Sequence, residues 1–170
     1  MSCEISEGRA QKCKTVGGIK NIYFVNYRNN LENESGFGTV FTNVVNVTPK
    51  LVSYKWELRG SQSMVTVGEV SRDNGTSFYT STGTFKFNEI GLWVASMLHV
   101  LSKGNPQVIT EDFNGTFLIY GWEHGCDVST TLNSGATMGD GQNSEITITS
   151  IEKEPPRNLF GEFMTVVEGV

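Results

Sequence analysis

The chain has few residues of the types that most often do chemistry. It contains two histidines and three cysteines, which are His99, His124, Cys3, Cys13 and Cys126. His124 and Cys126 lie two positions apart, so on a strand their side chains would face the same way and could touch. A cysteine beside a histidine base would be a nucleophilic pair, but no G-x-S-x-G turn accompanies it. An enzyme built on this pair is therefore an alternative interpretation and not the favoured one.

The same residues could instead bind zinc. His124 and Cys126 could supply two ligands, and Cys3 with Cys13 could complete a four-ligand site. The spacing matches no compact zinc motif, because one pair would have to come from the amino-terminal segment. We therefore interpret His124 as a turn residue, Cys126 as a small buried thiol and His99 as a partly exposed helix residue.

The remaining candidates are acidic or glycine-rich. Glu111 and Asp112 are adjacent carboxylates, but they precede an Asn-Gly turn and are expected at a solvated hairpin tip. The loop at residues 135–141 lacks the lysine of a phosphate-binding loop, and Asp140 and Glu145 do not fit a calcium-binding loop. The sequence thus predicts no catalytic, cofactor-binding or metal-binding residues, and a protein that is not an enzyme.

The elements that would position such residues are mostly strands. With 170 residues the chain is about one domain long. Its 19 glycines and its 18% of charged residues, below the usual ~25%, are typical of a turn-rich β protein. The net charge of −5 disfavours a sequence-reading nucleic-acid binder, which is normally basic. No signal peptide or membrane span is evident, so we expect synthesis in a cytoplasm and free thiols.

One helix is predicted over residues 88–103. Asn88 is expected to cap its start with Glu89 in the first turn, and Gly104 is expected to end it in a left-handed conformation. The helix should pack on a sheet, because the rest of the chain favours strands. Its apolar stripe consists of Ile90, Trp93, Val94, Met97, Leu98 and Leu101.

Alternating and β-branched stretches predict about eight or nine strands, mostly in hairpins. Asp73-Asn74-Gly75 and Asn114-Gly115 have the composition of tight hairpin turns. We expect a mainly antiparallel β-sandwich or flattened barrel with one flanking helix. One strand should place Val52, Tyr54, Trp56 and Leu58 on one face. The predicted strands cover residues 20–27, 39–47, 51–58, 62–70, 76–87, 107–113, 116–122, 126–132 and 145–153, with a further strand or arm at 163–167.

The predicted domain covers residues 19–156. Residues 1–18 lack periodicity and are expected to form an amino-terminal arm, and residues 157–170 a carboxy-terminal arm or strand. A long polar loop spans Arg28–Gly38, and a glycine-rich loop spans Asn133–Ser144. Terminal arms of this kind are either disordered or docked on a neighbouring molecule.

The order of elements in the second half is similar to that of a known family. An amphipathic helix (Phe87–Gly104) precedes a hairpin with a central Asn-Gly (Val108–Gly125), a strand, a Gly/Asp turn, a last strand and Pro155-Pro156. This order resembles the tail-tube fold of bacteriophage virion proteins. The start of the chain, Cys3–Tyr27, resembles small structural proteins of phages of gut Bacteroidetes, including crAss-like phages.

The resemblance implies a virion protein that self-assembles into a homo-oligomeric ring of the tail, with six copies or a multiple. Adjacent tail or portal-side proteins would be its partners, and genomic DNA would pass through the lumen without specific binding. Sheets of neighbouring copies would continue into one barrel, Arg28–Gly38 would reach the next ring, and the two arms would order on assembly. Neither a cofactor nor a membrane is implied.

Two physical considerations agree with a ring around DNA. Open sheet edges are normally blocked, and here they would be the means of assembly. An acidic wall would repel phosphate, in keeping with the net charge of −5. Two alternatives stay open: a small β-barrel binding protein or enzyme with a site at Cys126 and His124, and an external decoration or fibre-anchoring protein of the virion.

Overall fold

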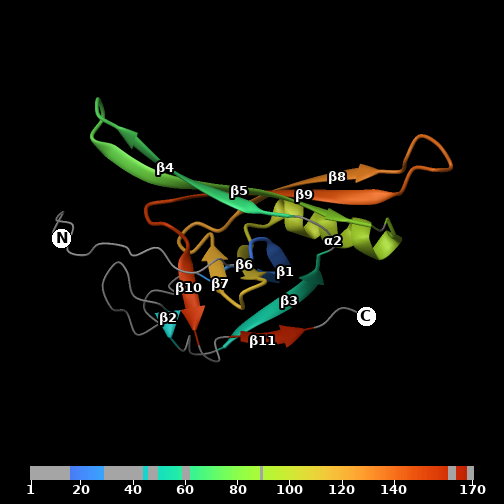
Figure 1. Ribbon diagram of the computed structural model, residues 1–170, viewed down its shortest axis with the longest axis horizontal. Helices are drawn as coiled ribbons and strands as arrows, with labels where there is room; N and C mark the ends of the chain where they lie inside the picture. The colour runs from blue at the N-terminus through green and yellow to red at the C-terminus, as the bar shows by residue number, and fades with distance from the viewer. Residues whose placement is uncertain are drawn as a thin grey trace.

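The chain folds into two β-sheets with one helix beside them. The computed structural model describes residues 16–28, 44–45, 50–58, 62–88, 90–160 and 164–167. Within this part of the chain there are eleven strands in a seven-stranded sheet, here sheet A, and a four-stranded sheet, here sheet B. Sheet B runs along the top of Figure 1 and sheet A lies below it. The expected class, mainly β with a flanking helix in a sandwich or flattened barrel, is confirmed.

Sheet A curls into a half-barrel. Its strand order is β11-β3-β1-β6-β7-β10-β2. The inner pairs are antiparallel, whereas β2 pairs in parallel with β10 and β11 in parallel with β3. Parallel neighbours require long connections, so these two pairs join segments far apart in sequence. The strands are β1 (Ile19–Val25), β2 (Val44–Val45), β3 (Leu51–Glu57), β6 (Gln107–Asp112), β7 (Phe117–Tyr120), β10 (Arg157–Phe160) and β11 (Met164–Val167).

Sheet B is antiparallel throughout, in the order β4-β5-β9-β8. Its strands are β4 (Met64–Ser71), β5 (Thr76–Phe87), β8 (Asp127–Asn133) and β9 (Asn143–Glu152). The predicted turn before β5 is present, with Ser71 opposite Thr76 and Gly75 at a φ of 62°. Figure 1 shows the β4–β5 and β8–β9 hairpins pointing to opposite ends of the molecule.

Two buried clusters hold the sheets together. The first lies between the sheets and joins β1, β6 and β7 of sheet A to β5, β8 and β9 of sheet B, with Phe24, Phe85 and Ile148 among its members. The second lies within the curl of sheet A and includes Tyr23 and Ile109. Because successive side chains of a strand point to opposite faces, the central strands of sheet A are buried on both sides.

The helix α2 (Leu92–Lys103) begins four residues later than predicted. Asn88 does not cap it, and the residue before its first turn is Gly91 in an extended conformation without a side-chain cap. The reason is the length of β5, which stays paired as far as Phe87 opposite Ser144, so the chain needs the next residues to change direction. At the other end Gly104 is also extended, with a φ of −97°, and the predicted left-handed stop is wrong.

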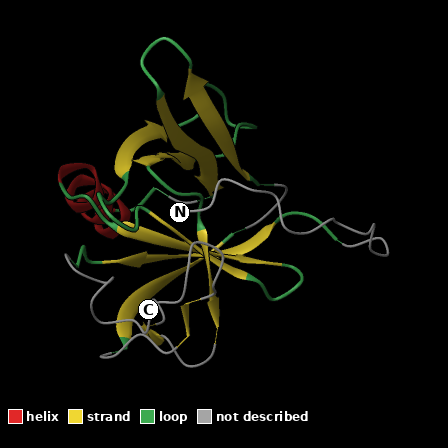
Figure 2. Cartoon of the chain, turned by 90° about the vertical axis from the view of Figure 1, so that its left-hand side faces the viewer, coloured by secondary structure: helices red, strands yellow, loops and turns green. Residues whose placement is uncertain are grey.

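Only part of the predicted apolar stripe of α2 is buried. Val94 and Leu98 lie in the cluster between the sheets, whereas the side chain of Trp93 is 59% exposed. Figure 2 shows the helix at one side of the junction between the two groups of strands. The helix therefore closes one side of the sandwich and leaves its far face in solvent.

The predicted alternating face of β3 is buried along only part of its length. Trp56 and Leu58 pack against the cluster between the sheets, but Val52 and Tyr54 are exposed. Leu51 of the same strand is buried instead, within the curl.

The described parts of both chain ends contact sheet A. Residues 157–160 and 164–167 are strands of this sheet. Residues 16–18 contact the β6–β7 turn, where Asn114 Nδ2 donates to the carbonyl of Val16 at 2.6 Å. Most of the predicted loop Arg28–Gly38 and of the predicted strand at 39–47 lies outside the described residues.

Candidate functional site

Sheet B has two open edges. Among the described residues, β4 pairs only with β5 and β8 pairs only with β9, so neither strand is paired on its other side. The helix α2 packs against β8 in the same buried cluster as Val128, which faces the core. An open edge is a template for another strand.

The β4 edge carries little of what usually blocks such a strand. Soluble proteins protect edges with lysine, proline or inward-pointing charges. The strand β4 contains one charged residue, Glu69, and neither lysine nor proline. Three of its valines are more than half exposed, at 57% for Val65, 52% for Val67 and 76% for Val70. A strand of this composition is suited to adding a partner strand.

The outward face of sheet B is rich in hydroxyl groups. The register places Thr80, Thr82 and Thr84 of β5 beside Ile151, Thr149 and Thr147 of β9 on the face away from the core. The hydroxyl oxygens of Thr84 and Thr147 are 3.3 Å apart. Two hydroxyl-rich strands thus form the centre of a broad, mostly uncharged surface.

The charges on this outward face are predominantly acidic. The outward-facing positions of its strands carry three carboxylates, from Glu69, Asp127 and Glu145, and one ammonium, from Lys86. Lys86 Nζ lies 3.2 Å from a carboxylate oxygen of Glu145, which leaves two carboxylates uncompensated. The face therefore carries a net charge of −2 and has no cluster of basic side chains for phosphate.

His124 and Cys126 are not brought together as a catalytic pair. The cysteine is 1% exposed and belongs to the cluster between the sheets. Burial raises the pKa of its thiol far above the ordinary value, and the nearby charge of Glu152 raises that pKa further, so the reactive thiolate is disfavoured. The side chain of His124 is 60% exposed, and its Nδ1 lies 3.4 Å from Glu152 Oε2. The interpretation of a turn histidine and a buried thiol is confirmed.

A tight turn explains this separation. Residues 122–124 form a turn closed by the N–H of Gly125 donating to the carbonyl of Gly121 at 3.0 Å. Both glycines have positive φ, and a Cβ on Gly121 would lie 2.5 Å from the carbonyl carbon of Gly125. The expectation that His124 and Cys126 share a strand face is wrong, because β8 begins only at Asp127.

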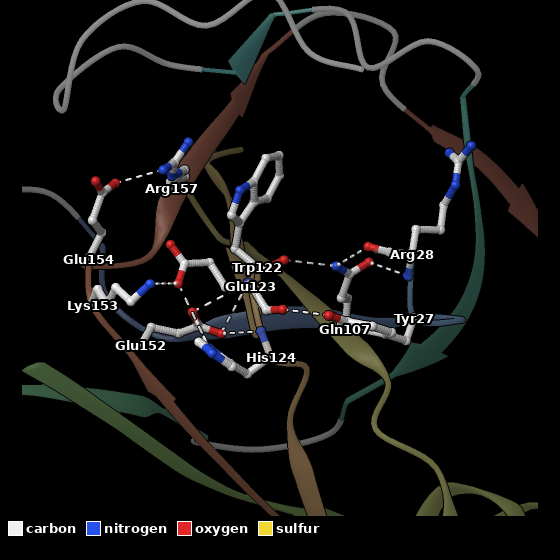
Figure 3. Close-up of polar contacts among 10 residues, drawn as sticks. All are labelled: Tyr27, Arg28, Gln107, Trp122, Glu123, His124, Glu152, Lys153, Glu154 and Arg157. Atoms are coloured by element: carbon white, nitrogen blue, oxygen red, sulfur yellow. Dashed lines mark hydrogen bonds and ion pairs between the residues drawn. The ribbon is translucent and has the colours of Figure 1, made fainter. Parts of the chain in front are cut away.

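Glu152 caps the same turn from the end of β9 (Figure 3). Its Oε1 accepts hydrogen bonds from the backbone N–H groups of Glu123 at 3.2 Å and His124 at 3.1 Å. Glu123 Oε2 lies 3.4 Å from Lys153 Nζ. Ligand atoms of Glu123, His124 and Glu152 therefore lie within 4.8 Å of one another. The sequence did not indicate this cluster, because Glu152 lies 28 positions after His124 and 29 positions after Glu123.

Side chains around this turn also tie sheet A together. The buried amide of Gln107 donates to the carbonyl of Trp122 at 3.1 Å and accepts from the N–H of Arg28 at 3.4 Å (Figure 3). The guanidinium of Arg157 lies over the Trp122 ring at 5.1 Å and is 2.6 Å from Glu154. These contacts link the ends of β1, β7 and β10.

A small pocket lies beside Trp122 and Arg157, bounded also by Pro155. Its volume is about 320 Å³ including space open to solvent, which is near the lower limit of the ~300–1,000 Å³ typical of ligand cavities. The pocket alone therefore does not indicate a substrate site.

The two adjacent acids have separate structural roles. Asp112 lies at the hairpin tip as predicted and accepts from the N–H groups of Asn114 and Thr116. The solvated position expected for Glu111 is wrong, since its side chain is 13% exposed. Its Oε2 accepts from Asn21 Nδ2 at 2.6 Å and Tyr23 OH at 2.7 Å. The reason is that β6 pairs with β1, which places Glu111 beside polar side chains of β1.

The other sequence candidates give no site. Asp140 accepts from the N–H groups of Thr137 and Ala136, which lower the pKa of this carboxyl and close its own loop. His99 is an exposed helix residue, as predicted. Cys3 and Cys13 lie outside the described residues, so the structure does not test the four-ligand zinc hypothesis.

Comparisons with protein-family models, with curated proteins and with solved structures find no match to this chain. No helix among the described residues is long and apolar enough to cross a membrane. The geometry of sheet B and the resemblance found in the sequence are therefore the grounds on which a function is proposed.

Proposed function

We propose that this chain is a non-enzymatic phage virion protein that self-assembles into a ring of the tail. The ring is either one layer of a tail tube or a single tail ring or connector layer, and it forms a conduit for DNA during ejection. The observation that carries the proposal is the pair of open edges on sheet B.

The two edges allow head-to-tail addition. When β4 of one copy pairs with β8 of the next, sheet B continues from copy to copy. The two strands are similar in length, with eight and seven residues, so neither leaves a long unpaired remainder. A contact between two different surfaces of the same protein closes into a ring when the rotation between copies permits it.

The outward face of sheet B is suited to line the lumen. It is broad, hydroxyl-rich and net acidic, with two uncompensated carboxylates in each copy. A ring of six would then present about twelve negative charges to the bore, which repel phosphate and disfavour tight binding of DNA. Sheet A and α2 would lie on the outer side of the ring and contact neighbouring tail proteins.

Mass photometry and negative-stain microscopy of the purified protein test the proposal. Rings or short tubes are the expected particles at micromolar concentration. A protein that stays monomeric at high concentration, also with neighbouring virion proteins added, contradicts it. Loss of a measurable enzyme activity in Cys126→Ala would instead favour the alternative of a small β-barrel enzyme.

Val67→Glu tests the β4 edge directly. Val67 is 52% exposed on the outward face, so the variant should fold, but the new carboxylate adds to that of Glu69 and would be repelled by Asp127 on the β8 strand of the next copy. We expect ring formation to weaken at least tenfold in concentration. Val100→Glu is the matched control, since this valine is 64% exposed on α2 and lies outside the joint. Equal assembly of the two variants contradicts a joint at β4.

A further inference from the structure

Three metal-ligating side chains meet where the two sheets join. Glu123 and His124 come from the turn after β7, and Glu152 comes from the end of β9. We propose that these three side chains bind one divalent transition-metal ion of the zinc class, with water as the fourth ligand. The site is separate from the assembly surface proposed above and stands independently of it.

Two of the three donor-atom distances are close to those of a metal site. His124 Nδ1 lies 3.4 Å from Glu152 Oε2 and 3.8 Å from Glu123 Oε2. Ligands bound at about 2.0–2.2 Å around a tetrahedral ion lie about 3.3–3.6 Å from one another. The ligand atoms of all three residues lie within 4.8 Å, so binding one ion requires the two carboxylates to approach each other by at most about 1.5 Å. An imidazole nitrogen with two carboxylates is a donor set that zinc accepts.

The surroundings hold the ligands in place. Glu152 is fixed by the backbone N–H groups of Glu123 and His124, which bind mainly its Oε1 and leave Oε2 directed at the imidazole. The side chain of Glu152 is 10% exposed, so it is anchored at the base of the cluster. Outer hydrogen bonds of this kind orient carboxylate ligands in metal proteins. The turn itself is held by Gly121 and Gly125.

The charges of the cluster also fit a dication. Two carboxylates provide two negative charges, which a divalent ion balances when the imidazole is neutral. Lys153 Nζ lies 3.4 Å from Glu123 Oε2, but its side chain is 77% exposed and can move into solvent when an ion binds. The side chain of His124 is 60% exposed, so water has access to the remaining coordination position.

Metal binding at this place would join the two sheets. The turn belongs to the end of sheet A and Glu152 to sheet B, so an ion adds a cross-link between them. A ligand that binds only the folded state raises the melting temperature, by about 5–10 °C at a hundredfold excess over its Kd for a chain of this size.

Titration of the full-length protein with ZnCl₂ tests the proposal by calorimetry and thermal melting. The parent is the Cys3→Ser/Cys13→Ser double variant, because thiols elsewhere in the chain also bind zinc. We expect one ion per chain and a higher melting temperature, with MgCl₂ giving neither. His124→Ala and Glu123→Gln should each weaken zinc binding at least tenfold, since the first removes one of the three proposed ligands and the second removes the charge of another.

His99→Ala is the matched control, since it removes the other histidine of the chain from an exposed position on α2. It should bind zinc as the parent does. Circular dichroism confirms that the variants are folded before titration. Absence of saturable zinc binding in the parent overturns the proposal, as does equal affinity in His124→Ala or binding that needs Cys3 and Cys13.

Discussion

At the scale of single residues, Glu111 is a carboxylate held between two strands. Burial raises its pKa, but hydrogen bonds from Asn21, Tyr23 and Lys20 together outweigh the effect of burial. The pKa of Glu111 in the folded protein is therefore lower than the ordinary 4.5. A carboxyl whose pKa is lower in the folded state stabilises the fold above its unfolded pKa, and this contribution disappears as the pH falls through the folded pKa. Its effect is therefore present at neutral pH and lost in acid.

Glu111→Gln should lower the free energy of unfolding by about 1.5–3 kcal/mol at pH 7, the range for hydrogen bonds to a charged group. The difference between wild type and variant should shrink as the pH falls below about 4.5, where the unfolded carboxyl becomes protonated. Urea denaturation at several pH values measures it. Glu57→Gln is the control, because Glu57 is 77% exposed and should change stability little. A pH-independent difference would contradict the account.

The same residue marks a limit of sequence interpretation. Glu111 and Asp112 look alike beside an Asn-Gly turn, and for Asp112 the local expectation of a turn-capping carboxylate is correct. The environment of Glu111 depends on β1, about 90 positions away, so no local pattern indicates it.

At the scale of elements, the turn at residues 121–125 shows how glycine permits a close approach. Gly121→Ala would place a Cβ 2.5 Å from the backbone of Gly125 and also forces alanine into a positive φ. We expect a loss of at least about 3 kcal/mol in unfolding free energy, from about 1–2 kcal/mol of backbone strain and the added collision. Chemical denaturation measures the loss.

Gly75→Ala is the matched control for this prediction. Gly75 has a φ of 62°, but a Cβ added there would meet no atom within 4 Å, so its substitution carries the backbone strain alone. The cost should stay near 1–2 kcal/mol. If both variants lose the same stability, close contact at Gly121 is not the cause.

The elements that depend only on local sequence were predicted most accurately. The hairpins around Gly75 and Gly115 are present because a glycine with positive φ at each turn needs no distant partner. The helix was located correctly, but its start at Leu92 follows from β5 pairing as far as Phe87, which is a tertiary contact. Trp93 fits the apolar period yet is 59% exposed, because only one face of its ring is stacked, on Trp56 at 6.5 Å.

At the scale of the whole molecule, the chain ends decide which parts belong to the folded domain. The carbonyl of Val16 accepts from Asn114 Nδ2, and the carbonyl of Gly18 accepts from the N–H of Phe113 at 3.4 Å. These contacts join residues 16–18 to the β6–β7 turn. The described fold therefore starts before the boundary at residue 18 expected from the sequence.

Deletion of residues 1–15 should leave the melting temperature within about 2 °C of wild type, because it keeps the contacts of residues 16–18. Under the proposed function the same deletion weakens ring assembly. Deletion of residues 1–18 removes the contacts and should lower the melting temperature more. Calorimetry and mass photometry provide the two measurements, and a collapse of the melting temperature in the shorter deletion would contradict this boundary.

Local sequence patterns are sufficient to predict the mainly β class, one amphipathic helix and two hairpin turns. Each of these depends on residues a few positions apart, whose periodicity and backbone preferences act locally. Long-range packing, in contrast, sets which strands share a sheet, the parallel pairing of β11 with β3, and the contact between Glu152 and His124. These arrangements depend on burying both apolar clusters at once, and that free energy is shared among strands distant in sequence.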